Sequence, residues 1–213
     1  MWCTGCGSGS HPAADASVAI DGTMGCQPTQ LLVGGTDVTA QGWSVVMQPP
    51  ATLTNGADHA KLVTTTSGAT GGQLLLNYPG AIEVGTPFKV EIEMLVESVT
   101  PHNQFDAGAA ILGSFTPPFG AGNDRNQMIY LDAARIGWAD DTQSFAVAVM
   151  DNRYHRYQLS VDAAGAALVT IDGAQALSRS GFVFNGALAI GDQTNDANVD
   201  SVLRIRSVTR LCL

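Results

Sequence analysis

An alternation of apolar and polar residues, repeated through most of the chain, is the feature that most constrains its fold. It is clearest over residues 88–97. There one set of alternate positions is apolar (Phe88, Val90, Ile92, Met94 and Val96) and the other is mostly charged (Lys89, Glu91, Glu93 and Glu97). Successive side chains point to opposite faces in a β-strand, so this period of two predicts a strand with one buried face.

Further segments with this alternation follow one another, bounded by Gly, Asn, Asp or Pro. They cover residues 43–48, 59–65, 72–78, 107–115, 126–133, 144–150, 154–163, 166–173, 187–192 and 201–209. Turn residues about every eight to twelve positions, without long helical stretches, are typical of an antiparallel sandwich or barrel. The pattern therefore predicts an all-β fold, a jelly roll of two antiparallel sheets.

The composition indicates one folded domain with an acidic surface. The 213 residues are 45% hydrophobic and 14% charged, which supplies enough apolar material for the core of a single sandwich. The formal net charge is −9 and no Lys or Arg cluster is present, so we expect no binding to nucleic acid. A glycan, another neutral small molecule or polymer, or a cation suits this charge better. No stretch approaches the roughly 18 consecutive apolar residues of a membrane span, so we expect no transmembrane segment.

Residues 1–28 are predicted to form a flexible tether before a sandwich domain over residues 29–213. Gly, Ser, Ala and Asp dominate the tether, which has no apolar periodicity and no pattern of a secretory signal. Small residues around a Cys, then a polar spacer, follow the lipid-bearing cysteine of bacterial lipoproteins. Cys3 or Cys6 is therefore a candidate lipid anchor, and an unconstrained tail is the alternative. We expect an extracytoplasmic bacterial protein, secreted or attached to the cell surface.

The cysteines are Cys3, Cys6, Cys26 and Cys212, and they favour an oxidising compartment. Four cysteines allow three pairings. Because sandwiches often pair their first and last strands, a Cys26–Cys212 disulfide is predicted, which would close almost the whole domain into one loop. A redox-active Cys-x-x-Cys at Cys3 and Cys6 is the alternative for those two. Such a motif normally begins a helix beside a βαβ unit, and the sequence predicts neither.

The last third of the chain carries several motifs in order: an aromatic-His-x-Tyr strand, a hairpin ending in Asp-Gly, a Gly-Asp with a polar loop, and a final strand led by Asp. The residues are Tyr154, His155, Tyr157, Asp172, Gly173, Gly191, Asp192 and Asp200. In these the chain resembles concanavalin A-like (laminin G-like) lectin and glucanase domains, over about residues 43–208. The resemblance implies a jelly-roll sandwich. Lectins, adhesion modules, glycoside hydrolases and polysaccharide lyases share this fold, so it does not choose among them.

The polar loop near the C-terminus is rich in oxygen donors. The resemblance implies that Asp200 binds a structural Ca²⁺ together with backbone carbonyls near the start of the domain. Asp192, Asn195 and Asp196 are further candidate ligands, because Ca²⁺ takes about six to eight hard oxygens. The loop lacks the regular Asp-x-Asp-x-Asp-Gly spacing of a dedicated calcium loop. The alternative is a connection whose side chains bond their own backbone in Asx turns.

Glu91, Glu93 and Glu97 are the candidate catalytic carboxylates of a glycoside hydrolase. They share one strand face. Laminarinase-type hydrolases of the resembling fold carry Glu-x-Asp-x-x-Glu, because a retaining mechanism needs two carboxyl groups about 5 Å apart. The chain departs from this motif, since Glu93 replaces the Asp and the last gap is one residue longer. A solvated outer face is therefore the preferred interpretation. The short strand motifs of polysaccharide lyases are not found.

His102 and Asp106 are the candidates for a metal-assisted hydrolase, although no His-x-His or His-x-x-x-His spacing supports that reading. His102 is more interesting as a loop residue at a sheet rim, where ligands are often bound.

For glycan binding, aromatic platforms and polar hydrogen-bonding side chains are required. The candidates are His102, Asn103, Gln104, Tyr130, Asp132 and Trp138. With only 7% aromatic residues, core packing is the alternative for Trp138. Because the catalytic signatures are missing or degraded, we predict a non-catalytic, lectin-like carbohydrate-binding module. A glycoside hydrolase or polysaccharide lyase is the main alternative, and a metal-assisted hydrolase is the third.

Overall fold

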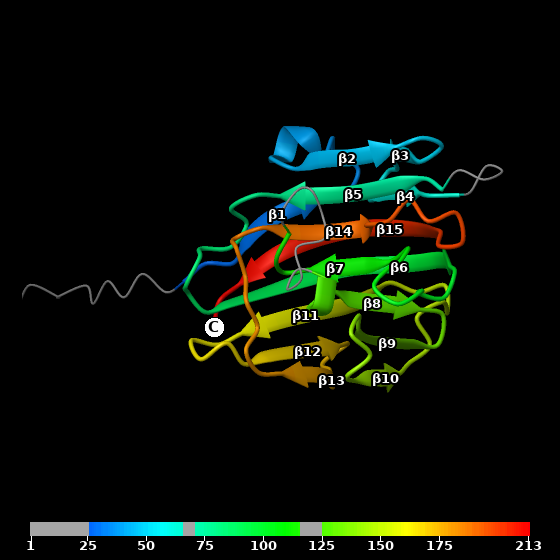
Figure 1. The fold of residues 1–213 in the computed structure, drawn as a ribbon. Helices are drawn as coiled ribbons and strands as arrows, with labels where there is room; N and C mark the ends of the chain where they lie inside the picture. The colour runs from blue at the N-terminus through cyan, green and yellow to red at the C-terminus, as the bar shows by residue number, and fades with distance from the viewer. Residues whose placement is uncertain (1–25, 66–70, 116–124) are drawn as a thin grey trace, which may run out of the picture.

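Two antiparallel β-sheets packed face to face form the structure, a computed structural model that describes residues 26–65, 71–115 and 125–213 (Figure 1). The predicted all-β jelly-roll class is confirmed. The candidate lipid-anchor residues Cys3 and Cys6, and most of the tether predicted over residues 1–28, lie outside the described residues. Within the described part of the chain, no helix is long and apolar enough to cross a membrane.

The eight-stranded sheet has the order β13-β12-β11-β6-β15-β4-β3, and β1 pairs with β15 beside this path. Its strands are β1 (Thr29–Val33), β3 (Thr52–Asn55), β4 (Ala60–Val63), β6 (Phe88–Val99), β11 (His155–Val161), β12 (Ala167–Ile171), β13 (Ala174–Arg179) and β15 (Ser201–Leu211). The long strands β6 and β15 pair along most of their length, which brings the end of the chain into the middle of the sheet.

The seven-stranded sheet has the order β10-β9-β8-β7-β14-β5-β2. Its strands are β2 (Ser44–Gln48), β5 (Gln73–Tyr78), β7 (Ala110–Leu112), β8 (Ile129–Asp132), β9 (Arg135–Trp138), β10 (Ser144–Ala146) and β14 (Leu188–Asp192). A short 3-10 helix, η1 (Thr39–Gln41), precedes β2. Because β14 lies between β5 and β7, residues from distant parts of the sequence meet at the ends of these strands.

The alternation along β6 decides which of its faces lies in the core. The apolar set is buried, with no member more than 4% exposed: Phe88, Val90, Ile92, Met94 and Val96. On the neighbouring strand β11, Tyr157 pairs with Ile92 and Leu159 with Val90, so their side chains enter the same core between the sheets. Burying each large aliphatic side chain stabilises the fold by about 1.5–3 kcal/mol.

The seven-stranded sheet is covered on its outer face as well. A second cluster of buried residues lies there, formed by strand residues (Leu75, Ala110, Leu112, Tyr130 and Ala189) and by residues of the connections (Ala107, Phe115, Met128, Ala139 and Ala187). Strand β14 is accordingly buried at every position. The connection between β6 and β7 therefore packs against this face, and this packing positions the polar side chains that the connection carries.

The predicted Cys26–Cys212 disulfide is confirmed. Strands β1 and β15 pair antiparallel with Thr29 opposite Arg210, so the residues just beyond these strand ends meet. The two cysteine Cα atoms lie 5.7 Å apart, and the bond joins positions 186 residues apart in the sequence.

Candidate functional site

Two connections meet at one end of the sandwich. We call residues 100–109, between β6 and β7, the rim loop, and residues 193–200, between β14 and β15, the polar loop. The hydrogen bonds between them include those from Asn103 Nδ2 to Asp196 Oδ2 (3.3 Å), from Gln193 Nε2 to the Phe105 carbonyl (2.8 Å) and from the Asp200 N–H to Thr100 Oγ1 (2.6 Å). Because β6 leads into one loop and β15 follows the other, the pairing of these strands brings the loops together.

A polar cavity of about 250 Å³ opens where these loops meet the start of β5, and we call it the rim pocket. Its lining residues are Gln73, Asp106, Arg125, Gln193, Thr194 and Asn195. The Gln73 amide donates to the Gln193 carbonyl over 2.7 Å, which ties the first residue of β5 to the polar loop. Amide, hydroxyl and carboxylate groups from four separate parts of the chain thus converge on one small volume.

The charges that line the rim pocket neutralise each other. Arg125 Nη2 donates to Asp106 Oδ1 in an ion pair, and the side chains of both residues are 30% exposed. The guanidinium carbon of Arg125 also lies 5.7 Å from the centroid of the Phe105 ring. A neutral, hydrogen-bonding lining beside one aromatic ring suits a neutral polyhydroxylated ligand better than an ion.

His102 fixes the rim loop to the outer face of the seven-stranded sheet. Its Nδ1 lies 2.9 Å from Asp132 Oδ2, and its backbone N–H donates to Asp132 Oδ1 over 2.9 Å. The imidazole is stacked on Tyr130, with ring centroids 3.6 Å apart. The side chains of His102 and Asp132 are only 6% and 8% exposed. Strand β8 therefore holds this loop by a buried carboxylate and an aromatic ring.

The structure does not bring His102 and Asp106 into contact, as the metal-assisted hydrolase interpretation needs. The second ring nitrogen of His102, Nε2, lies 3.2 Å from Asp141 Oδ1, and Asp106 pairs with Arg125. Both imidazole nitrogens thus face carboxylates. This arrangement orients the ring and supports the loop.

Three of the six residues predicted to contact a glycan are buried, and one of them, Asp132, holds His102 instead of facing solvent. Trp138 is 0% exposed, in the core between the sheets, where its ring packs near Phe182. Tyr130 is also 0% exposed, beneath His102. Neither ring can form an exposed platform, so both assignments are corrected. Asn103 and Gln104 are exposed in the rim loop, as a contact role requires.

Asp192 is a buried carboxyl group at the end of β14. It is 0% exposed, and burial raises its pKa to about 8, an effect that the nearby carboxylates of Asp200 and Asp106 increase. Its Oδ1 accepts a hydrogen bond from the Thr194 N–H over 3.0 Å, whereas Oδ2 accepts none within the described part of the chain. A buried oxygen without a donor is costly unless a proton or a cation satisfies it.

The candidate calcium ligands separate into two groups. Asp196 lies on the surface, where Oδ1 accepts hydrogen bonds from Asn198 in an Asx turn and Oδ2 accepts one from Asn103. Asn195 is exposed and lines the rim pocket. Of the candidate ligands, only the buried Asp192 and the half-buried Asp200 adjoin each other, and within the described residues no group of three or more His, Cys, Asp or Glu could hold a metal.

The expected neighbours of Asp200 are also different. Strand β1 pairs with the C-terminal part of β15, whereas Asp200 precedes the N-terminal end of β15. The backbone next to Asp200 belongs to Thr100 and Gly108 of the rim loop, not to the start of the domain.

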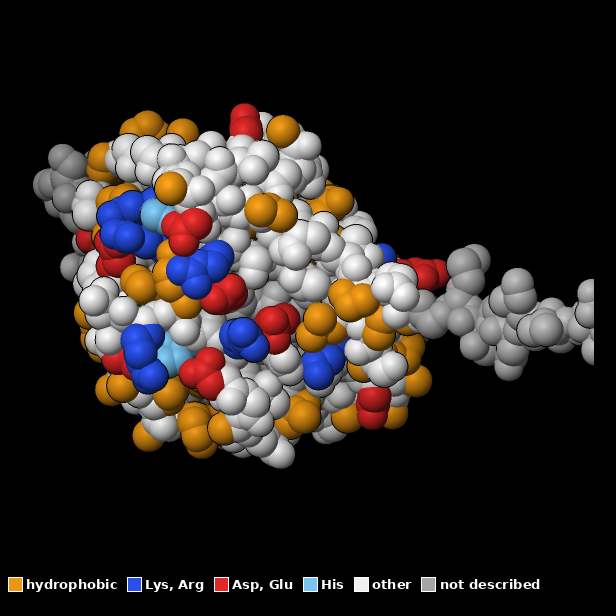
Figure 2. Space-filling model, turned by 180° about the vertical axis from the view of Figure 1, so that it is seen from behind, with side chains coloured by type: hydrophobic (Ala, Val, Ile, Leu, Met, Phe, Trp, Pro, Cys, Tyr) orange, Lys and Arg blue, Asp and Glu red, His pale blue; other side chains and the backbone are white. Residues whose placement is uncertain are grey.

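Glu91, Glu93 and Glu97 lie on the outer face of the eight-stranded sheet, where acidic and basic side chains stand next to one another (Figure 2). Their partners are Gln158 for Glu91 (2.6 Å), Arg206 for Glu93 (3.0 Å), and Lys61 (2.9 Å) and Arg204 for Glu97. Each carboxylate is thus held by a cation or an amide, which is the arrangement of a solvated, ion-paired sheet face.

His155, one of the residues of β11 that carry the family resemblance, is held between two carboxylates, and we call this arrangement the clamp around His155. His155 is 3% exposed; its Nδ1 lies 2.7 Å from Asp172 Oδ2 and its Nε2 lies 3.0 Å from Asp151 Oδ1. Asp172 Oδ1 also accepts the Arg156 N–H over 2.9 Å. These contacts join the start of β11 to the turn between β12 and β13, so the motif supports the fold.

Gln73 and Arg125 are pocket residues that the sequence did not single out. Gln73 begins a strand and Arg125 stands in a connection, and neither lies in a recognisable motif. Only the pairing of β5 with β14, residues more than a hundred positions apart, places Gln73 beside the polar loop. Gln193 and Thr194 belong to the loop that the sequence marked only as rich in oxygen donors.

No protein-family model and no curated protein matches the chain. Solved structures with the same architecture include the carbohydrate esterase vb_24B_21 from the Shiga toxin-encoding bacteriophage phi24B, at 16% identity and a TM-score of 0.58, over 86% of this chain and 98% of that chain. The exoplasmic/lumenal domain of VIP36 in its Ca²⁺/Man-bound form is 12% identical with a TM-score of 0.57, over 86% and 89% of the two chains. The fold is therefore a concanavalin A-like sandwich, as the resemblance implied.

Proposed function

We propose that this protein is a carbohydrate-binding module that recognises a neutral glycan at the rim pocket. The observation that carries the proposal is the convergence of six polar side chains, with one cation and one anion paired, on a cavity of about 250 Å³. Amide and carboxylate groups can each bond adjacent sugar hydroxyls. Asn103 and Gln104 are exposed on the same rim loop as Asp106 of the pocket.

The proposal agrees with what some proteins of the same fold bind. VIP36 was solved with Ca²⁺ and mannose, and the phage protein is a carbohydrate esterase. At 12% and 16% identity these likenesses support a fold that is compatible with carbohydrate binding. The choice of ligand therefore rests on the local geometry of the rim pocket.

We propose a binding role without hydrolysis. The three candidate glutamates are held by ion pairs and a hydrogen bond on the outer face of the eight-stranded sheet, and none of them lines the rim pocket. Both ring nitrogens of His102 face carboxylates, so the geometry gives His102 a positioning role and not that of a general base.

Calcium forms a second part of the proposal. Asp192 Oδ2 is a buried acceptor without a donor in the described residues, and the Asp200 carboxylate adjoins it. These two carboxylates fit a cation that needs oxygen ligands, with backbone carbonyls and hydroxyl groups completing its coordination. When bound, Ca²⁺ would neutralise the buried Asp192 and the half-buried Asp200 and hold the polar loop against β15. Asp196 and Asn195 take no part, because the side chain of Asp196 is used in local hydrogen bonds and Asn195 is exposed in the rim pocket.

An extracytoplasmic location is part of the same proposal. The Cys26–Cys212 disulfide would persist only in an oxidising compartment, which excludes a typical cytosol. Attachment through a lipid at Cys3 or Cys6, and bacterial origin, stay predictions.

The test is a glycan array with labelled full-length protein, followed by calorimetric titration of the best glycan. Asn195→Ala and Gln73→Ala should each weaken binding about threefold to tenfold, the effect of one lost neutral hydrogen bond. Asn198→Ala is the matched control, because Asn198 lies in the same loop and is exposed, but does not line the pocket.

If all three variants bind the glycan with the same affinity, the rim pocket is not the glycan-binding site. Release of reducing ends from the bound glycan by wild-type protein would contradict the non-catalytic part, and the glutamate variants Glu91→Gln, Glu93→Gln and Glu97→Gln would then identify the carboxylate involved.

A further inference from the structure

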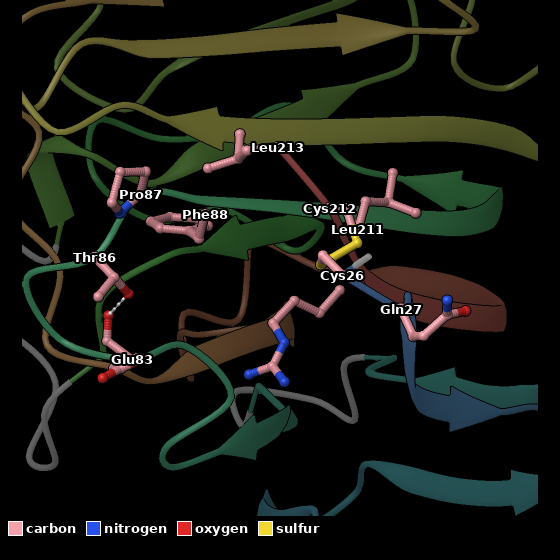
Figure 3. Close-up of a pocket in the computed structure, with 10 residues that line it drawn as sticks. Cys26, Gln27, Glu83, Thr86, Pro87, Phe88, Leu211, Cys212 and Leu213 are labelled. Atoms are coloured by element: carbon pink, nitrogen blue, oxygen red, sulfur yellow. Dashed lines mark hydrogen bonds between the residues drawn. A yellow bond between two sulfur atoms is a disulfide. The ribbon is translucent and has the colours of Figure 1, made fainter. Parts of the chain in front are cut away.

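A second cavity, of about 440 Å³, lies at the end of the sandwich opposite the rim pocket (Figure 3). We call it the disulfide pocket, because Cys26 and Cys212 form part of its wall. Phe88, the first residue of β6, lines it, whereas the rim loop follows the last residue of β6. A strand of this length separates the two cavities by roughly 40 Å. Its volume is in the range of cavities that hold small ligands.

Arg210 supplies a positive charge from the inner face of the sheet. It lies opposite Val90 in the register of β15 and β6, two positions after Val208, which lies opposite Ile92. Val90, Ile92 and Val208 are buried in the core, and cross-strand partners share a sheet face. The Arg210 side chain therefore enters the open end of the sandwich, where it lines the disulfide pocket.

The charge of Arg210 is not neutralised by a carboxylate in the described part of the chain. Its polar contact there is a 3.4 Å hydrogen bond from Nη2 to Thr29 Oγ1. Most of the other basic residues of this acidic chain are in ion pairs. Arg210 differs from them because its side chain points into the sandwich and its guanidinium has no carboxylate partner among the described residues. An unpaired, half-buried guanidinium is a ready partner for a carboxylate.

The remaining surface of the disulfide pocket is largely apolar. Phe88 is 4% exposed and packs edge-to-face on Phe184, with ring centroids 5.0 Å apart. Pro87 and Leu213 add aliphatic surface, and Figure 3 shows these side chains around the same space as the disulfide. Glu83 also lines the cavity; it is an exposed residue of the turn between Glu83 and Thr86.

We propose that the disulfide pocket binds a small carboxylic acid with an apolar body. The carboxylate pairs with the Arg210 guanidinium through parallel N–H···O bonds, and the apolar body covers Phe88 and the disulfide. Free alkyl or aryl acids and the apolar C-terminal residue of a peptide share this chemistry. The site is independent of the glycan proposal, since the two cavities have no residue in common.

The test is calorimetric titration of the full-length oxidised protein with sodium octanoate, which represents a free acid, and with N-acetyl-leucine, which represents a peptide end. Methyl octanoate and N-acetyl-leucine amide are the uncharged controls, and acetate is the control without an apolar body. We expect at least one acid to bind wild-type protein and its uncharged partner to bind tenfold or more weakly. Arg210→Gln should cause a similar loss, since both changes remove the charged hydrogen bonds.

Lys89→Gln is the matched control. Lys89 also lies near the end of the sheet, opposite Leu211, but on the outer face of β6 and outside the cavity, so its loss should leave the affinity unchanged. Glu83→Gln should strengthen binding by removing a repelling charge, and it reports on the site even if Arg210→Gln folds poorly. Failure of both acids to bind wild-type protein, or equal affinity in Arg210→Gln, would overturn the proposal.

Discussion

The imidazole of His102 lies on the phenol ring of Tyr130, with an interplanar angle of 16° and 3.6 Å between ring centroids. Asp132, two residues after Tyr130 on the same face of β8, faces His102 Nδ1 and accepts its backbone N–H. The strand thus fixes both the ring and the backbone of His102. This anchor sets the position of the rim loop, whose Asp106 lines the rim pocket.

Asp132→Asn should therefore weaken glycan binding although Asp132 does not line the rim pocket. The substitution preserves shape but removes the charge, so the two hydrogen bonds from His102 and the one from Arg135 Nε (3.1 Å) lose their strength. Loss of a hydrogen bond to a buried charged group costs about 1.5–3 kcal/mol. We expect the free energy of unfolding to fall by about this amount in urea titration, and the calorimetric affinity for the glycan to fall with it.

Asp141→Asn is the control for this experiment. Asp141 faces the other ring nitrogen of the same histidine, but its side chain is 63% exposed, so water replaces the lost contact. Its effect on unfolding should be below about 1 kcal/mol. If the two variants lose the same stability and affinity, Asp132 is not the anchor of the loop.

Removal of the Cys26–Cys212 disulfide should lower stability strongly. The bond joins positions 186 residues apart, and the loss of chain entropy in the unfolded state gives it about 5 kcal/mol in the loop-closure estimate. The double variant Cys26→Ser/Cys212→Ser should therefore melt well below the wild type in calorimetry. An unchanged melting temperature would show that the pairing of β1 with β15 is sufficient without the covalent bond.

Much of the fold could be predicted from the sequence because most strands bury one face. Every segment with alternating residues contains a strand, and the core face of β6 was predicted residue by residue. The alternation did not identify β1, β3, β9 or β13, which are four to six residues long. Both β3 and β13 are edge strands of the eight-stranded sheet, and β3 has no buried residue, so no apolar alternation marks it.

The site was harder to predict because it depends on contacts between distant segments. Periodicity shows that a strand has two faces, but not that the rim loop covers the outer face of β8, which buries Tyr130. Trp138 is of a residue type that can form a sugar-binding platform, but its side chain lies in the core between the sheets. The rim pocket forms only because β5 lies beside β14 and the rim loop lies beside the polar loop. The sheet topology sets both relationships, and no local sequence pattern indicates them.

Calcium should stabilise the protein if Asp192 and Asp200 bind it. A ligand that binds only the native state adds about 2.7 kcal/mol at a hundredfold excess over its Kd. The melting temperature should therefore rise with millimolar CaCl₂ and fall with chelator, and Asp200→Asn should abolish the response. Asp196→Asn should retain it, because the Asp196 carboxylate is used by Asn198 and Asn103. A calcium response that depends on Asp196 instead would contradict the assignment to Asp192 and Asp200.

The clamp around His155 predicts a specific dependence of stability on acid. The hydrogen bond from Arg153, together with the contact with His155, lowers the pKa of Asp151 to about 2. In the unfolded chain this carboxyl group titrates near its ordinary value of 3.8. Between these values the unfolded state binds more protons, so the stabilisation is present above about pH 4 and is lost as the pH falls toward 2.

Asp151→Asn should remove this part of the acid dependence. The variant keeps the shape of the side chain but has no proton to gain, so its free energy of unfolding should fall less steeply than that of wild type between about pH 4 and pH 2. At neutral pH the variant should be the less stable of the two, because His155 and Arg153 lose a charged partner. Urea titrations of both proteins at intervals across this range measure the difference. Parallel curves would show that Asp151 contributes nothing to acid sensitivity and that His155 is held by Asp172 alone.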